Sequence, residues 1–430
     1  MIRTKTHRRA GMTILEVLFA IMITTVGLLG AIAVFPVASE YARKGRLNDE
    51  VTVCAESAVH AMDARGMRRP DHWMALIDNS PNPPAVYTGP QLGPLAPAGA
   101  WRGFSQTSFC IDPRFTAQNI PNNVNYEWTY FPAFPRQVAV AANNPGSPRM
   151  QRITLANGSP GANPPYAPAF VPMGRFQADY VFSFPDQLMF ERPGVQRSST
   201  NNDNASPAFQ LYSPIKDPNN PGTIYPGKRE DEGKLSWMAT LVPKIDRWNA
   251  TLDDKYVLST VVFYNRSPNL VVDLTGASGP LNEWTATILG TDFHSSGYGG
   301  GEVTLTATGP GAADRLKVRS GDWVMLSANV RANIFINNTL TVATVPHFKW
   351  YRVSDADEDP YEQLPIGSGI FKRDVTLVGP DWDLQDVFPT NGSASPNGGD
   401  SIPDDVEVII VPHVVAVFDR TVRLEFDGTG

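Results

Sequence analysis

One uninterrupted apolar segment near the amino terminus constrains this chain more than any other feature. Residues 12–37 read MTILEVLFAIMITTVGLLGAIAVFPV and contain a single charged residue, Glu16. A helix of about 20 apolar residues is long enough to cross the hydrocarbon core of a bilayer. We therefore expect a transmembrane helix at residues 12–37, which leaves the rest of the chain to supply the globular fold.

The residues before this segment set its expected orientation. Residues 1–11 contain four basic residues and no acidic residue. Basic residues that flank a membrane helix stay on the cytoplasmic side. We expect these residues in the cytoplasm, a single pass through the membrane, and the bulk of the chain outside the cytoplasm. A secretory signal peptide and an uncleaved signal anchor begin in the same way, and both remain alternatives at this point.

Glu16 is the unusual residue of the apolar segment. A carboxylate near the bilayer centre costs a few kcal/mol, so it persists only where a partner satisfies it. Cleavage of the chain after Gly11 would create a new α-amino group at Met12, four residues before Glu16. The two groups then lie near one helix face. They would also neutralise each other between neighbouring, slightly staggered helices.

The segment Gly11-Met12-Thr13-Ile14-Leu15-Glu16-Val17, with its basic leader at residues 1–11, resembles the class III signal of type IV prepilins and type II secretion pseudopilins. The resemblance implies that a prepilin peptidase cuts after Gly11 and methylates the new amino terminus at Met12. It also implies that Glu16 guides the docking of subunits in a filament. The variant is most similar to minor pilins and minor pseudopilins, and the resemblance covers residues 1 to about 66.

The resemblance implies a minor pilin or pseudopilin subunit that is assembled into a type IV pilus or a type II secretion pseudopilus. Its expected partners are other pilins or pseudopilins, which it contacts through the amino-terminal helix, together with the prepilin peptidase and the inner membrane. The alternative is a membrane-anchored extracytoplasmic binding domain, or an enzyme, that carries a prepilin-type leader.

The helix is expected to continue beyond the membrane. Apolar residues recur at spacings of three and four, which is one helical face: Leu47, Val51, Cys54, Ala58 and Met62. We predict one long helix over residues 12–66, amphipathic from residue 38, with this face packed on the sheet of the head. Gly66 is the expected stop signal.

The remainder is expected to be rich in β-structure. Gly and Pro account for 35 and 38 residues, which favours turns and short strands. We predict an α+β fold in which the long helix packs on a head of antiparallel sheets. Residues 67–275 form a loop-rich pilin-like β domain with a hairpin of Leu235–Val242 and Lys255–Asn265. Residues 276–430 form a second β-rich region, either a sandwich or a small barrel. Further strands are expected at Arg175–Phe184 and Arg315–Val318.

Enzyme activity has little support in the sequence. The six histidines lie outside metal motifs, and the chain contains no G-x-S-x-G elbow and no phosphate-binding G-x-x-x-x-G-K-[ST] loop. The net charge of −7 makes the chain a poor candidate for binding nucleic acid. We therefore expect no catalytic residue, no cofactor and no nucleic-acid partner.

One acidic run keeps a metal hypothesis open. Asp355, Asp357 and Asp359 alternate like the first ligands of a calcium loop. Pro360 stands where such a loop needs glycine, and Ile366 stands where it needs glutamate. Because some pseudopilins bind calcium in loops of the β domain, calcium remains a hypothesis for these three residues. The alternative is a solvated acidic turn.

The two cysteines, Cys54 and Cys110, cannot supply a four-cysteine zinc site or ligate an iron–sulfur cluster alone. In an oxidising compartment we expect them to form one disulfide. The alternative is a pair of buried free thiols.

Overall fold

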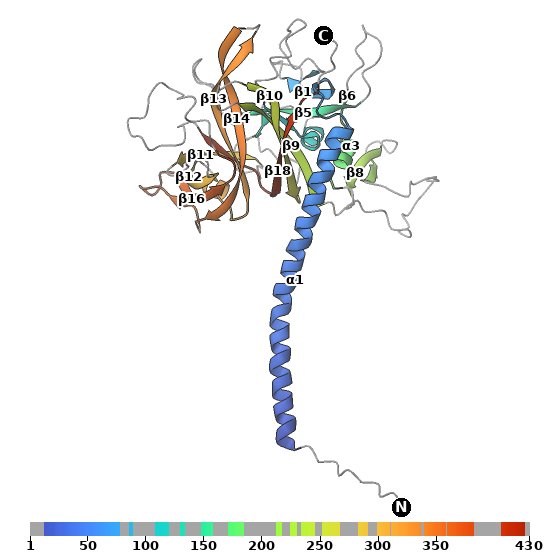
Figure 1. Ribbon diagram of the computed structural model, residues 1–430, viewed down its shortest axis with the longest axis vertical. Helices are drawn as coiled ribbons and strands as arrows, with labels where there is room; N and C mark the ends of the chain where they lie inside the picture. Colours follow the sequence, from blue (N-terminus) through green and yellow to red (C-terminus); the bar gives the residue numbers. More distant parts are fainter. Residues whose placement is uncertain are drawn as a thin grey trace, which may run out of the picture. The chain divides into compact units, whose positions relative to one another are not determined.

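The protein is described by a computed structural model with one long helix and a β-rich head (Figure 1). The structure describes residues 13–77, 86–88, 108–119, 130–133, 148–157, 171–184, 212–216, 224–229, 234–245, 252–266, 283–290, 299–309, 311–336, 339–357, 359–381 and 406–425. The compact units are residues 1–53 and 54–430. The α+β class agrees with the prediction.

Helix α1 spans Ile14–Ala64 without a break, and Pro36 lies inside it. It ends as the sequence predicts. The amide of Met67 donates to the carbonyl of Met62 (2.9 Å) and the amide of Gly66 donates to that of Asp63 (3.2 Å). Gly66 has a φ of +60°. This pair of bonds defines a Schellman motif, which satisfies two of the last carbonyls of the helix.

The predicted apolar face of α1 is buried in its last turns. Cys54, Ala58 and Met62 are at most 1% exposed. Next to the helix end, Arg68 pairs with Glu425 (2.6 Å), and the carbonyl of Arg68 accepts a bond from the amide of Glu425 (3.0 Å). The carboxyl-terminal strand is therefore attached to the residues that end α1.

The first sheet has nine strands in the order β18-β10-β9-β3-β5-β1-β2, with β4 and β6 paired to β5. Its strands are β1 (Trp73–Ile77), β2 (Val86–Thr88), β3 (Phe109–Ile111), β4 (Tyr130–Phe131), β5 (Met150–Asn157), β6 (Val171–Pro172), β9 (Leu235–Ile245), β10 (Leu252–Tyr264) and β18 (Val414–Arg423). The predicted hairpin is confirmed as β9 and β10. The sheet is mixed and not purely antiparallel, because β3 and β5 run parallel. A separate hairpin consists of β7 (Tyr212–Lys216) and β8 (Ile224–Arg229).

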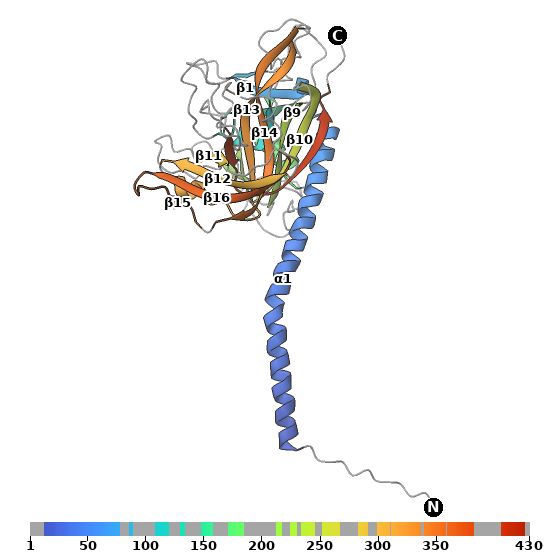
Figure 2. The same ribbon diagram turned by 60° about the vertical axis from the view of Figure 1, so that its left-hand side comes forward.

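The second sheet closes on itself. Its strands are β11 (Trp284–Gly290), β12 (Gly300–Thr308), β13 (Trp323–Ile336), β14 (Thr339–Ala356), β15 (Tyr361–Glu362), β16 (Ile370–Val378) and β17 (Glu407–Ile410). The order is β12-β11-β17-β13-β14-β16-β15, and the pairing of β12 with β16 closes a barrel of six strands. Of the two predicted architectures, the small barrel is the one found (Figure 2).

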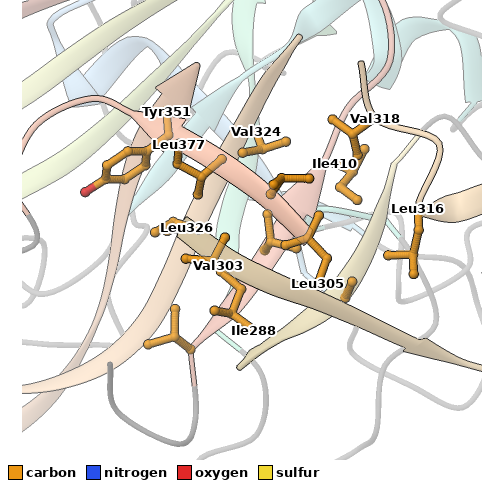
Figure 3. Close-up of a cluster of buried hydrophobic side chains, with 14 of the residues drawn as sticks. Ile288, Val303, Leu305, Leu316, Val318, Val324, Leu326, Tyr351, Leu377 and Ile410 are labelled. Atoms are coloured by element: carbon orange, nitrogen blue, oxygen red, sulfur yellow. The ribbon is translucent and has the colours of Figure 1, made fainter. Parts of the chain in front are cut away.

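Alternation along the strands fills the barrel. Val303 and Leu305 on β12 point inward, as do Val375 and Leu377 on β16, because successive strand residues face opposite sides. Figure 3 shows that Val303, Leu305 and Leu377 meet Leu326 and Ile410 in one cluster. The barrel interior is thus a packed aliphatic core.

The two sheets share a second core. Met238, Val261 and Phe263 of the first sheet pack with Met325 and Trp350 of the barrel. After β17 the chain leaves the barrel, and β18 pairs with β10 along nine residues of each strand. The expected boundary near residue 275 therefore separates the sheets only as far as β17.

Two predicted strands are wrong. Arg175–Phe184 contains helix α3 (Arg175–Val181), and α4 (Ala312–Arg315) overlaps the start of the expected strand Arg315–Val318. The remaining helices are α2 (Pro113–Asn119) and the short 3₁₀ turn Pro70–His72.

Candidate functional site

Helix α1 presents a long apolar surface. In the part of the chain that the structure describes, it is the one helix long and apolar enough to cross a membrane, and none of the residues in its most apolar window is buried. The hydroxyls of Thr24 and Thr25 donate to the carbonyls of Ala20 and Ile21, each at 2.7 Å. These hydroxyls are satisfied within the helix, which is what a lipid environment requires.

Glu16 lies in the first turn of α1. Its amide donates to the hydroxyl oxygen of Thr13 (3.3 Å), so Thr13 caps the helix. The Glu16 carboxylate makes no hydrogen bond or ion pair with any described residue. Gly11 and Met12 lie outside the described residues. The cleavage and the pairing of Glu16 with a Met12 amine therefore remain predictions.

One face of the apolar half of α1 is lined by small residues. Ala20, Thr24, Gly27 and Ala31 follow Glu16 at spacings of four, four, three and four, which places them on one face. Nothing lies within 4 Å of a Cβ built on Gly27. The far side carries large residues, among them Leu18, Met22 and Leu29. Small residues at these positions allow a second helix to approach this face closely.

Charged residues mark the end of the apolar run. Glu40 pairs with Arg43 (3.0 Å) and with Lys44 (4.0 Å), and Arg46 pairs with Glu50 (2.8 Å). A hydrogen bond from Arg43 lowers the pKa of Glu40 below its usual value. The apolar surface thus ends close to Pro36, as the sequence predicts.

The structure corrects the expected disulfide, because Cys54 and Cys110 are both free and buried. Cys110 belongs to the core between the two sheets, where its Sγ lies 3.9 Å from the Sδ of Met238. Its neighbour Phe109 points to the opposite face of the sheet and packs against Trp73. Cys110 therefore faces the barrel, whereas Cys54 belongs to α1. Burial raises the pKa of Cys54 to about 12 and also raises that of Cys110.

The acidic run does not gather into a calcium site. Asp355, Asp357 and Asp359 are all exposed, and the described residues contain no cluster of three or more His, Cys, Asp or Glu side chains that could hold a metal. Asp355 is still within β14, where alternate residues are roughly 6.6 Å apart. A calcium ion needs oxygens within about 2.6 Å of itself, so its loop must curl. The described residues therefore give the calcium hypothesis no support, and Glu358, inside the run, lies outside them.

Four charged residues in the head were not singled out by the sequence, and they form a buried ionic cluster. The Arg152 guanidinium on β5 pairs with Asp112 (2.7 Å) and with Glu283 (2.6 Å). Arg266 pairs with the same two carboxylates, at 2.6 and 3.6 Å. The Arg152 guanidinium also lies 3.6 Å from the ring centroid of Phe115.

The ionic cluster connects the two sheets. Asp112 follows β3, Arg266 follows β10, and Glu283 precedes the first barrel strand. Burial opposes the charge on Asp112, but Arg266 and Arg152 outweigh it and hold its pKa below the usual value. One local signal was available, because Asp112 precedes Pro113 as the cap of α2. Nothing in the sequence links the other three residues.

Comparisons of this chain with protein-family models, with curated proteins and with solved structures found no match.

Proposed function

We propose that this protein is a minor pilin or pseudopilin subunit of a type IV pilus or a type II secretion pseudopilus. Its leader is removed after Gly11, α1 holds it in the inner membrane, and the head lies outside the cytoplasm. It acts by assembly and not by catalysis, and the head presents a binding or structural surface.

The observation that carries the proposal is the placement of Glu16. It is the only charge in residues 12–37, it lies in the first turn of α1, and it starts the face that continues through Ala20 and Gly27. A membrane anchor needs neither an acid within its apolar segment nor a small face. A helix that packs against other helices uses both, because small residues permit close approach and the acid finds a cation across the interface.

The proposed mechanism is the transfer of α1 from lipid into a bundle of similar helices. In the bundle, the Glu16 carboxylate of one subunit meets the Met12 amine of a neighbour. The thiols, the acidic run and the ionic cluster of the head take no part in this step. The alternative, an anchored binding domain, requires α1 only as an apolar span.

The first test is the mature amino terminus and the role of Glu16. Intact-mass analysis of the native protein should show a chain that begins at Met12 with one added methyl group. Glu16→Gln keeps the shape and removes the charge, so we expect little of this variant in sheared filaments. Glu40→Gln, on the same helix beyond the apolar run, is the matched control and should assemble normally. A native chain that still begins at Met1 contradicts the proposal. Filaments that contain normal amounts of the Glu16→Gln variant contradict it as well.

A second test separates assembly from anchoring. Gly27→Leu fits the isolated helix but blocks close approach on the small face. Ala33→Leu adds comparable bulk on the far side. We expect only Gly27→Leu to lower the amount of protein in filaments, with both variants equally abundant in the membrane. Equal loss from filaments for the two variants supports the anchored binding domain instead.

A further inference from the structure

The loop between β15 and β16 exposes apolar side chains that the head does not use. Leu364 is 78% exposed and Ile366 is 82% exposed, and Tyr361 at the start of the hairpin is 46% exposed. β15 is the end strand of its sheet and lies at the periphery of the barrel in Figure 2. We call residues 361–370 the apolar tip.

The apolar tip is held in one conformation by its own hydrogen bonds. The Glu362 carboxylate accepts bonds from the amides of Gly367 (2.9 Å) and Gly369 (3.0 Å). The Ser368 hydroxyl donates to the carbonyl of Gln363 (2.8 Å), and the amide of Gln363 donates to that of Ile370 (2.8 Å). An ordered loop loses little conformational entropy on binding, which favours a protein contact.

The acidic run lies at the base of the same hairpin. Asp355, Asp357 and Asp359 are exposed and lead directly into β15. The amide of Asp357 bonds to the carbonyl of Asp374 on β16 (3.1 Å), so the run is attached to the hairpin. Two of the nearby cations are paired or buried: Lys317 pairs with Asp314 (2.8 Å), and Arg373 is buried. Lys372 is half-buried on β16. The apolar tip is thus flanked by a negative rim.

We propose that the apolar tip and its acidic rim dock into an apolar pocket with a basic rim on another protein. Leu364 and Ile366 are the anchors, and the three aspartates select the charge of the partner. Anionic lipid headgroups would be repelled by the same aspartates. A second copy of this chain would present a like-charged rim. The proposal does not depend on the proposed function, since an anchored head would dock in the same way.

The test is site-specific photo-cross-linking with the full chain in the cells that produce it. A photoreactive phenylalanine analogue replaces Leu364, and in a second strain it replaces Tyr180, an exposed aromatic residue on α3 that serves as the control. We expect one discrete protein adduct from position 364 only, with the cross-linked peptide of the partner rich in Lys and Arg. An adduct with lipid, with a second copy, or with the same proteins from both positions overturns the proposal, as does no adduct.

Variants then separate the two parts of the surface. With the analogue kept at position 364, Ile366→Ser should lower the adduct yield about tenfold. Changing all three aspartates to Lys should lower it as well, and the loss should shrink in high salt. Tyr180→Ser, the matched surface control, should leave the yield unchanged. These residues are exposed, so the melting temperature should stay the same. An adduct that is insensitive to Ile366→Ser and to the charge reversal refutes the docking model. Glu16→Gln should not change the adduct, which keeps this test separate from the assembly tests.

Discussion

At the scale of single residues, the head depends on charges that are removed from water. Arg152 and Asp112 have side chains that are at most 1% exposed. Removing one partner of a buried pair leaves an uncompensated charge, which costs more than the pair itself contributes. The sequence could not reveal this cluster, because Asp112 and Glu283 are far apart in the chain and meet only when the two sheets are assembled. Only the local role of Asp112, which caps α2, could have been predicted from the sequence.

We predict that Asp112→Asn lowers the stability of the head by about 3–5 kcal/mol, because it leaves Arg266 and Arg152 with one carboxylate to share. Tryptophan fluorescence of the full chain in detergent during thermal unfolding measures the change. Asp314→Asn removes a carboxylate from an exposed pair with Lys317 and is the control, with no measurable shift expected. Equal melting temperatures for Asp112→Asn and the wild type would show that the cluster does not hold the sheets together.

The pKa of Asp112 sets the pH dependence of that difference. Its folded-state pKa lies below the usual value, so its contribution is complete above the unfolded pKa of about 3.9 and is lost as the pH falls through the lower folded pKa. The difference in stability between the wild type and Asp112→Asn should therefore be constant near neutral pH and should become smaller only in strong acid.

At the scale of elements, the sequence predicted correctly those helix ends and strands that depend only on neighbouring residues. The end of α1 at Gly66 follows from one glycine, and the hairpin of β9 and β10 was predicted from its own two segments. A strand was wrongly predicted at Arg175–Phe184, where Phe176, Tyr180 and Phe182 lie at even spacings, as in a strand. In the structure, Ala178 and Val181 are buried at helical spacing, and Asp179 pairs with the buried Arg114 (2.7 Å). A contact distant in sequence thus decides the conformation of this segment.

We predict that Gly66→Ala destabilises the head by about 1 kcal/mol. Its φ of +60° disfavours a Cβ, while the nearest atom to that Cβ, in Arg69, is 3.4 Å away. The cost is therefore conformational and not a clash. Gly66→Asn is the matched variant and should lose less, since Asn tolerates the left-handed region. Thermal unfolding of both variants measures the order, and an alanine variant as stable as the asparagine variant contradicts this account.

At the scale of the whole molecule, the head is built from two main sheets that the chain connects twice. The barrel closes through β12 and β16, and β18 returns to the first sheet after the barrel is complete. Both connections join segments that no local pattern relates. From the sequence, a small barrel was one of two predicted architectures, and the pairing of β12 with β16 that closes it could not be predicted. The last strand was assigned to the same region as the barrel because it follows the barrel strands in the chain.

We predict that this protein is a low-copy or tip subunit and not the repeating subunit of a filament shaft. A compact body the size of residues 67–430 has a radius of gyration of about 20 Å and is roughly 50 Å across. Packed helices approach to about 8–10 Å, so heads of this size repeated along a tight helical core would crowd one another. The residues beyond the basic leader carry a net charge of −11, because the leader's four basic residues contribute +4 to the chain's total of −7, and like-charged heads repel within a Debye length of about 8–10 Å. A position at the tip removes the conflict, because no further subunit lies above it.

Quantitative mass spectrometry of purified filaments should find this chain as a small fraction relative to a shorter pilin. If it is the most abundant subunit, the heads must stack without clashing and the tip position is wrong.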